Sequence, residues 1–474
     1  TAIEDTVAAC AKRTAGGYED MGPITDDPAL KGYGDSNLKV AGEGNLIAAV
    51  WIRQKETVDK DPGDPVRNED IVLMTSSTEI MAAIYDGTKW TVERLTHNDT
   101  PDLAPVVAVG GGKVFVAYRS TGPSKVDNPF DFSLLDTIVY RVYDAAAKKW
   151  SDPRTLYNGT NGTVMGLAAA ALEDGTAAVA YVVNEAPEAL AADGMAGTGN
   201  EIVYAVIDTD LAFGAPDVNP VLKNLQVTRD GRTDENPQIT TAVFPDDEER
   251  FVIAWHSAEM MDGQLEHDIK LVAVNADGEV YGGFVDSLSV LATHQSVKVQ
   301  SNFAFARMKR DWRTLGNLSI LWKEPETEFG EDGIVTRDSI KAVKFGAETR
   351  ADGGYGYYLS GVIEVADMPD YTAADSIDAY VSDPSENEIK ALILGTTYTT
   401  DAHEEHRPLN PGKVDGDDVP VRVIREQSAM YTATEVYANR FRVDETGYSP
   451  GEIVPGFDLP IRFRLVNLGM DKIE

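Results

Sequence analysis

The stretch that decides the fold runs from Pro105 to Asn158 and contains four segments with the composition of short β-strands. It reads Pro105-Val-Val-Ala-Val, Gly110-Gly-Gly-Lys, Val114-Phe-Val-Ala-Tyr118, a polar insert, Asp136-Thr-Ile-Val-Tyr-Arg-Val-Tyr-Asp144 and Lys148-Lys-Trp-Ser-Asp-Pro-Arg-Thr-Leu-Tyr157. A glycine-rich turn joins the first two segments, and the third is rich in Val, Ile and Tyr. This pattern predicts four consecutive strands.

The same four-strand unit recurs along most of the chain, and a repeat has to be recognised before any single motif is interpreted. Further copies begin at Asn37, Leu167, Pro237 and Phe303, and a more degenerate sixth copy begins near Ser376. An aromatic residue closes the second strand of the first five copies, at intervals of 63 to 74 residues. These residues are Trp51, Tyr118, Tyr181, Trp255 and Trp322, and we expect them to be buried between neighbouring units.

Radial repetition of four-stranded antiparallel units is the pattern of a β-propeller, in which only short strand edges stay exposed. Long windows with the i, i+3, i+4 apolar spacing of helical repeats are absent from the sequence. We therefore predict an all-β chain with a six-bladed propeller at residues 37–432. A seventh blade assembled from the two termini is the alternative. Residues 1–36 form either a lead-in segment or a strand that closes the ring.

The connection between the second and third strands is long and polar in each of the first five units. Since such connections emerge at one end of every blade, we expect a loop-rich face there and tight turns such as Gly110-Gly111-Gly112 at the other. Loops held by a rigid scaffold often carry binding sites. The five inserts are residues 53–69, 119–135, 182–200, 256–267 and 323–337.

Composition restricts the classes of partner. The formal net charge is −36, which disfavours nucleic acid and anionic membrane surfaces, because both repel a polyanion. A single cysteine, Cys10, excludes an intrachain disulfide and a cysteine-based zinc site. No segment approaches the length of about 18 apolar residues that a membrane helix needs. The charge is typical of a secreted or cell-surface protein, and we expect one here.

Residues 433–474 differ in character from the repeats. Glu435–Val443, Tyr448–Gly456 and Leu459–Gly469 predict two or three strands with turns between them. The segment resembles the opening of immunoglobulin-like β-sandwiches such as the cell-adhesion-related bacterial domain. That resemblance implies an incomplete sandwich, completed by further residues of a longer parent protein or by a neighbouring subunit.

The repeats resemble sialidase-type propellers of extracellular bacterial proteins. The resemblance rests on blade ends such as Tyr85-Asp-Gly-Thr-Lys-Trp90, followed by Leu95-Thr-His-Asn-Asp99 and Pro105-Val-Val-Ala108. The repeated sialidase turn Ser-x-Asp-x-Gly-x-x-Trp is not reproduced with its spacing. Arg53 and Arg119 follow the second strand of neighbouring units, but the sequence predicts solvated strand-end arginines rather than a carboxylate-binding set.

Three segments have residues that could bind a metal ion. Asp415, Asp417 and Asp418, like the acidic cluster at 59–64, provide the oxygen ligands that calcium prefers, so calcium is the possible cofactor. His403 and His406 could bind zinc if they lay on one helix face, but Pro408 indicates a loop.

The sequence therefore favours a non-catalytic extracellular propeller that binds a glycan or a protein through its loop-rich face, or serves as a structural part of a surface assembly. We predict no catalytic residues. The alternative is a glycan-cleaving, sialidase-like hydrolase, which would need two carboxylates a few ångströms apart across a cleft.

Overall fold

The computed structural model describes two parts of the 474-residue chain in different detail. Up to residue 288 it describes strands and most connections, and beyond that point strands alone. Strand is the dominant element of the described residues, and none of their helices is long and apolar enough to cross a membrane. The described residues are 7–14, 17–24, 34–56, 67, 70, 73, 76–98, 100–121, 136–159, 163–184, 199–229, 232–244, 248–261, 264–288, 303–306, 318–330, 333–349, 355–359, 363–367, 372–383, 388–400, 423–437, 441–443 and 463–465.

The chain divides into two compact units. The first comprises Thr1–Thr241, Glu249–Met260 and His267–Tyr281, and the second comprises Ala242–Glu248, Met261–Glu266 and Gly282–Glu474.

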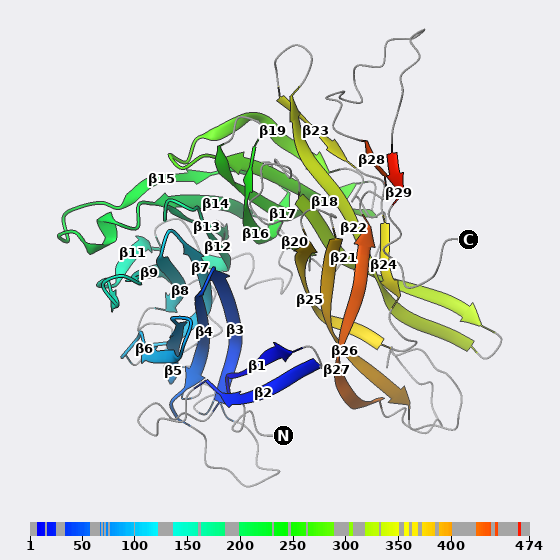
Figure 1. Cartoon of the computed structure of the whole chain (residues 1–474), viewed down its shortest axis with the longest axis horizontal. Coiled ribbons are helices and arrows are strands. Elements are labelled where there is room, and N and C mark those ends of the chain that lie inside the picture. Colours follow the sequence, from blue (N-terminus) through cyan, green and yellow to red (C-terminus); the bar gives the residue numbers. More distant parts are fainter. Residues whose placement is uncertain are drawn as a thin grey trace. The chain divides into compact units, whose positions relative to one another are not determined.

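Four consecutive antiparallel sheets follow one another along the chain up to residue 288, and each is a meander in sequence order (Figure 1). Sheet 1 contains β3 (Gly34–Glu43), β4 (Leu46–Gln54), β5 (Thr78–Tyr85) and β6 (Trp90–Arg94). Sheet 2 contains β7 (Asp102–Gly110), β8 (Lys113–Thr121), β9 (Asp136–Asp144), β10 (Lys149–Trp150) and β11 (Arg154–Tyr157). Sheet 3 contains β12 (Thr163–Ala171), β13 (Ala177–Asn184), β14 (Asn200–Ile207) and β15 (Val221–Gln226). Sheet 4 contains β16 (Thr233–Val243), β17 (Glu249–Met261), β18 (Gln264–Val274) and β19 (Val280–Leu288).

Consecutive sheets pack face to face, because both faces of their second and third strands are apolar. In β13, Val179 and Tyr181 belong to the core between sheets 2 and 3, whereas Ala178, Ala180 and Val182 belong to the core between sheets 3 and 4. An equivalent core joins sheets 1 and 2. Alternation of side chains along a strand therefore supplies two cores per sheet, as the stacked blades of a propeller require.

The five aromatic residues predicted to lie between units are all buried, with exposed fractions between 0% and 8%. Tyr118, Tyr181 and Trp255 each face the preceding sheet. Trp51 lies on the corresponding face of sheet 1, where it packs with Ala8. The register derived from the repeats is confirmed at these positions.

The N-terminal segment covers that face of sheet 1. β1 (Ala9–Thr14) and β2 (Gly17–Pro23) pair with each other in a two-stranded sheet of their own. Ala8 donates its backbone N–H to Asp35 Oδ2 at 2.8 Å. Ile24 packs against the core that contains Trp51 and donates to the Ala8 carbonyl at 2.9 Å.

The predicted tight turn between β7 and β8 is present, and it requires glycine. Gly111 has φ +57°, and a Cβ there would lie 2.5 Å from the backbone nitrogen of Gly175 in the neighbouring turn of sheet 3. A side chain would therefore clash with the adjacent sheet.

The second unit also consists of antiparallel strands. The fifth repeat copy corresponds to β20 (Phe303–Ala306), β21 (Leu318–Gly330), β22 (Gly333–Thr349), β23 (Tyr355–Leu359) and β24 (Ile363–Asp367), which form one sheet. The sixth copy falls in a sheet with three described strands: β25 (Thr372–Asp383), β26 (Glu388–Thr400) and β27 (Val423–Tyr437). Two further strands, β28 (Phe441–Val443) and β29 (Phe463–Leu465), pair antiparallel near the C-terminal end. A count of six blades stays a prediction.

Two of the five predicted loop inserts are strand instead. In the fourth insert, β17 continues to Met261 and β18 begins at Gln264. In the fifth, β21 continues to Gly330, where it pairs with Gly333 at the start of β22. Polar residues here lie in hairpin strands, because backbone hydrogen bonds between paired strands form whatever the side chains are. The dipeptide Asp262-Gly263 favours a two-residue hairpin turn and is the sequence feature that could have indicated the first of these hairpins. The central parts of the first three inserts lie outside the described residues.

Candidate functional site

Buried polar side chains gather at one end of sheets 1 to 4. At this end of sheets 1 to 3 the first and third strands begin, the second strand finishes and the predicted inserts leave, whereas in sheet 4 β17 and β18 continue past the buried polar residues. We call it the insert end. A buried polar group is costly unless it is hydrogen-bonded, so this concentration has to be explained. The buried residues are Arg53, Ser77, Glu79, Thr96, Asp102, Asp136, Thr163, Asn184, Asn200, Glu201, Thr228, Asp234, His256 and Ser257.

Glu79 at the start of β5 is the centre of the first group. The Thr96 hydroxyl donates to Glu79 Oε2 at 2.5 Å and accepts the backbone N–H of Ile80 at 2.9 Å. Lys55 Nζ lies 2.7 Å from the other carboxylate oxygen and donates to the Asn98 carbonyl at 2.7 Å. Thr96 therefore holds the connection between sheets 1 and 2 against the first residues of β5.

Asp102, at the start of β7, is a second buried carboxyl in the same group. Its exposed fraction is 0%, and its Oδ2 accepts a hydrogen bond from Asn98 Nδ2 at 3.0 Å. Burial raises the pKa of Asp102 to about 6, although hydrogen bonds from Ser120, Thr96 and Asn98 lower it in part. The negative charge of Glu79 nearby raises it slightly further.

Sheet 3 repeats the arrangement of Glu79 and Thr96. The Thr228 hydroxyl donates to Glu201 Oε2 at 2.7 Å and accepts the backbone N–H of Ile202 at 2.8 Å. At the start of β16, Asp234 occupies the position of Asp102 and accepts the indole N–H of Trp255 at 3.1 Å.

The sequence contains a signal for this repeat that our sequence analysis missed. Residues 95–105 read Leu-Thr-His-Asn-Asp-Thr-Pro-Asp-Leu-Ala-Pro, and residues 227–237 read Val-Thr-Arg-Asp-Gly-Arg-Thr-Asp-Glu-Asn-Pro. Thr, Asp and Pro coincide, and the residue before each proline, Ala104 or Asn236, has φ 50°. Asn37, two residues after Asp35 in β3, has φ 53°, so sheet 1 shares the backbone feature.

The two arginines behave differently from the prediction. Arg53 is 9% exposed and binds both oxygens of Asp35, each at 2.7 Å, so the expectation of a solvated side chain is wrong. Arg119 is partly buried and donates to the Val164 carbonyl at 2.9 Å, with its Nε 3.9 Å from Asp136. These arginines hold β3 and β12 to neighbouring strands.

The predicted metal ligands lie outside the described residues. This holds for Asp415, Asp417 and Asp418, for His403 and His406, and for the acidic cluster at 59–64. Within the described part of the chain, no group of three or more His, Cys, Asp or Glu side chains is arranged to hold a metal ion. Cys10 is a free, half-buried thiol.

The geometry of the insert-end group is suited to joining sheets. Asp102 has the raised pKa expected of a general acid, but such a group must reach the proton acceptor of a substrate. Asp102 is 0% exposed and Glu79 is 1% exposed. Threonine, lysine and asparagine partners occupy the surroundings of these carboxyls, so the group binds parts of the chain to each other.

Comparisons with known proteins give weak similarities. No protein-family model matches the sequence, and no curated protein sequence matches it. A Trypanosoma rangeli sialidase with the inhibitor DANA aligns at 10% identity and TM-score 0.41, over 83% of this chain and 56% of the sialidase. A Dyadobacter fermentans protein of unknown function aligns at 9% identity and TM-score 0.40, over 85% and 95% of the two chains. Kuenenia stuttgartiensis hydrazine synthase aligns at 12% identity and TM-score 0.35, over 76% and 75%. The chain spans little more than half of the sialidase, and all three TM-scores are below 0.5.

Proposed function

We propose that the chain is a non-catalytic, secreted or cell-surface propeller module. It binds a glycan or a protein through the loop surface at the insert end, or it serves as a structural part of a surface assembly. One observation carries the proposal: ionisable side chains at the insert end of sheets 1 to 3 are buried and bound to other parts of the same chain.

These interactions suit a scaffold for loops. Glu79 and Glu201 each bind a threonine from the connection to the next sheet. Asp35 binds Arg53 and the backbone of Ala8. Hydrogen bonds of this kind fix the strand ends from which the inserts start, and loops on a fixed scaffold are common binding surfaces.

The same interactions argue against the hydrolase alternative. A glycoside hydrolase places two carboxyls on opposite sides of the scissile bond, where both reach the substrate. Asp102 and Glu79 are both buried, so neither carboxyl is open to a substrate. Arg53 and Arg119 are similarly engaged with protein acceptors.

The remaining features of the proposal come from the sequence. A net charge of −36 suits an exposed module that must stay soluble. The acidic segment with Asp415, Asp417 and Asp418 is the proposed calcium site. Residues 433–474 are proposed to join the module to further domains or to neighbouring subunits.

The proposal is tested by combining a binding assay with a turnover assay. The purified chain is applied to a glycan array and incubated with aryl glycosides, including sialosides. We expect binding without turnover. Replacing residues 122–135 or 185–198 by a short Gly-Ser linker should abolish binding and leave the melting transition within a few degrees. Hydrolysis that disappears when one acidic residue at the insert end is changed would establish the enzyme alternative.

A further inference from the structure

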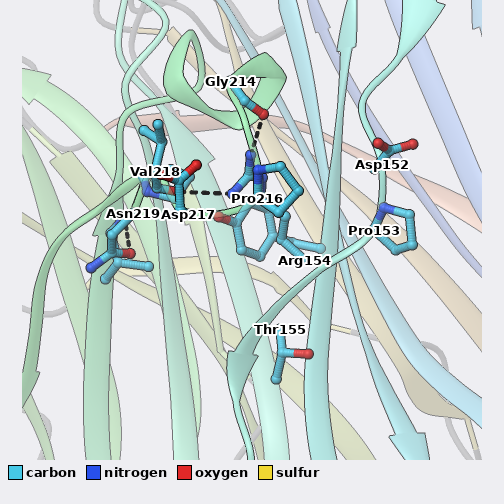
Figure 2. Close-up of a pocket in the computed structure, with 12 residues that line it drawn as sticks. Asp152, Pro153, Arg154, Thr155, Gly214, Pro216, Asp217, Val218 and Asn219 are labelled. Carbon is cyan, nitrogen blue, oxygen red and sulfur yellow. Dashed lines mark hydrogen bonds between the residues drawn. The ribbon is translucent and has the colours of Figure 1, made fainter.

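A cavity of about 360 Å³ lies between the start of β11 in sheet 2 and the connection from β14 to β15 in sheet 3 (Figure 2). One side is formed by the residues around the start of β11, from Asp152 to Thr155. The other side is formed by residues 214–221, which connect β14 to β15. This connection leaves β14 at the end opposite to the insert end, so the cavity is separate from the loop surface discussed above.

Arg154 holds the connection in place. Its Nε donates to the Ala212 carbonyl at 3.0 Å and its Nη1 to the Val218 carbonyl at 2.8 Å. Its Nη2 donates to the carbonyls of Gly214 at 2.8 Å and Ala215 at 3.2 Å. Four hydrogen bonds from one planar guanidinium fix the wall of the cavity before any ligand arrives, which lowers the entropy lost on binding.

Tyr140 supplies an unused polar group to the cavity. Its exposed fraction is 1%, and its ring stacks with Phe115 in the core between sheets 2 and 3. The hydroxyl is therefore the part of Tyr140 that reaches the cavity lining, and it has no hydrogen-bond partner among the described residues. A ligand oxygen or nitrogen can therefore form a hydrogen bond with this hydroxyl, which both donates and accepts.

The charges and shapes of the lining select the ligand. Asp152 and Asp217 outnumber the cation Arg154, so an anionic ligand is disfavoured, as it is by the overall charge. Carboxylates accept hydrogen bonds from hydroxyl groups, and the Asn219 side chain adds further polar atoms. Apolar C–H surface is provided by Pro153, Pro216 and Pro220.

We propose that this cavity binds a single neutral hexopyranose residue, such as the terminal sugar of a glycan. The ligand is rich in hydroxyls, which match the carboxylates and the Tyr140 hydroxyl, and its C–H faces match the prolines. The cavity volume of about 360 Å³ is near the lower limit for small-molecule sites and fits one sugar ring. This proposal does not depend on binding at the insert end.

The test uses the full chain and the methyl glycosides of glucose, galactose and mannose as probes. Saturation-transfer NMR and titration calorimetry should detect millimolar binding of at least one of them. Tyr140→Phe and Asp217→Asn should each weaken that binding about five-fold, as expected for the loss of one hydrogen bond. The matched controls Tyr143→Phe, on the opposite face of β9, and Asp277→Asn, an exposed carboxylate outside the cavity, should leave it unchanged.

Arg154→Lys adds a test of the preformed wall. Lysine has too few donors for four carbonyls, so this variant should weaken the same binding and broaden the backbone amide signal of Gly214. Three results would overturn the proposal. They are absence of binding by all three glycosides at tens of millimolar, preference for sialic or glucuronic acid, and equal affinities of the wild type, Tyr140→Phe and Asp217→Asn.

Discussion

Asp102 should make the stability of the protein depend on pH. The carboxyl is 0% exposed, and burial raises its pKa from 3.8 to about 6. Below pH 3.8 the group is protonated in both the folded and the unfolded chain. As the pH rises from 3.8 to 6, the unfolded chain releases this proton first, so the folded state loses stability over that window.

The size of the effect follows from the shift. The rise in pKa from 3.8 to about 6 corresponds to about 3 kcal/mol of unfolding free energy, since a change of one in pKa corresponds to roughly 1.4 kcal/mol. Asp102→Asn removes the titration and keeps the shape of the side chain. We therefore expect the free energy of unfolding of this variant to rise by about 3 kcal/mol relative to that of the wild type as the pH increases from 3.8 to 7, because only the wild type loses stability through this carboxyl.

The assay is urea unfolding, followed by tryptophan fluorescence at several pH values from 4 to 8. The large negative charge of the chain also changes stability with pH, but it contributes almost equally to both proteins and cancels in the difference. Asp277→Asn, which removes an exposed carboxylate, corrects for the loss of one charge. A difference between wild type and Asp102→Asn that stays flat from pH 4 to pH 7 would refute the reasoning.

Three further predictions follow from the sheet packing and the hydrogen bonds. Trp51→Ala should lower the free energy of unfolding by about 3–5 kcal/mol in urea titrations, because it opens a cavity under the N-terminal segment. A loss below about 1 kcal/mol would contradict this packing role. Thr228→Val should cost about 1–3 kcal/mol, since it leaves Glu201 and the Ile202 N–H short of a partner, and Thr228→Ser should restore most of the loss if the hydroxyl is responsible. Removing residues 438–474 should shift the melting temperature by only a few degrees in calorimetry, because β27 ends at Tyr437, and complete unfolding would place that segment in the core.

The strand pattern was predictable because it depends on local periodicity. Both faces of strands such as β13 are apolar, and the aromatic residue near the end of the second strand recurs in every sheet of the first unit. Burial of Tyr181 and Trp255 could therefore be inferred from their position in the repeat. The hairpins that extend β17 and β21 were not predicted, because a strand of polar residues has the same composition as a loop.

The polar groups at the insert end could not be assigned from composition. The chain has 78 acidic residues, and composition alone does not distinguish Asp102 from an exposed aspartate. Its burial results from residues brought together across two sheets, such as Ser120 and Thr96. Arg53 was wrongly expected to be solvated for the same reason, since its partner Asp35 lies on the adjacent strand. The recurrence of Thr, Asp and Pro in residues 95–105 and 227–237 is the sequence feature that could have identified the group.

That recurrence also explains how the sheets are joined. The apolar cores between sheets are non-directional, so they favour stacking without fixing the angle between one sheet and the next. The hydrogen bonds of Thr96 and Thr228 are directional, and each lies where the chain passes from one sheet to the next. Sheets 1 and 3 carry this threonine–glutamate pair, whereas Arg119 of sheet 2 binds the Val164 carbonyl of sheet 3 instead. Different residues thus perform one task at successive junctions of sheets 1 to 3, where directional hydrogen bonds add to non-directional apolar packing.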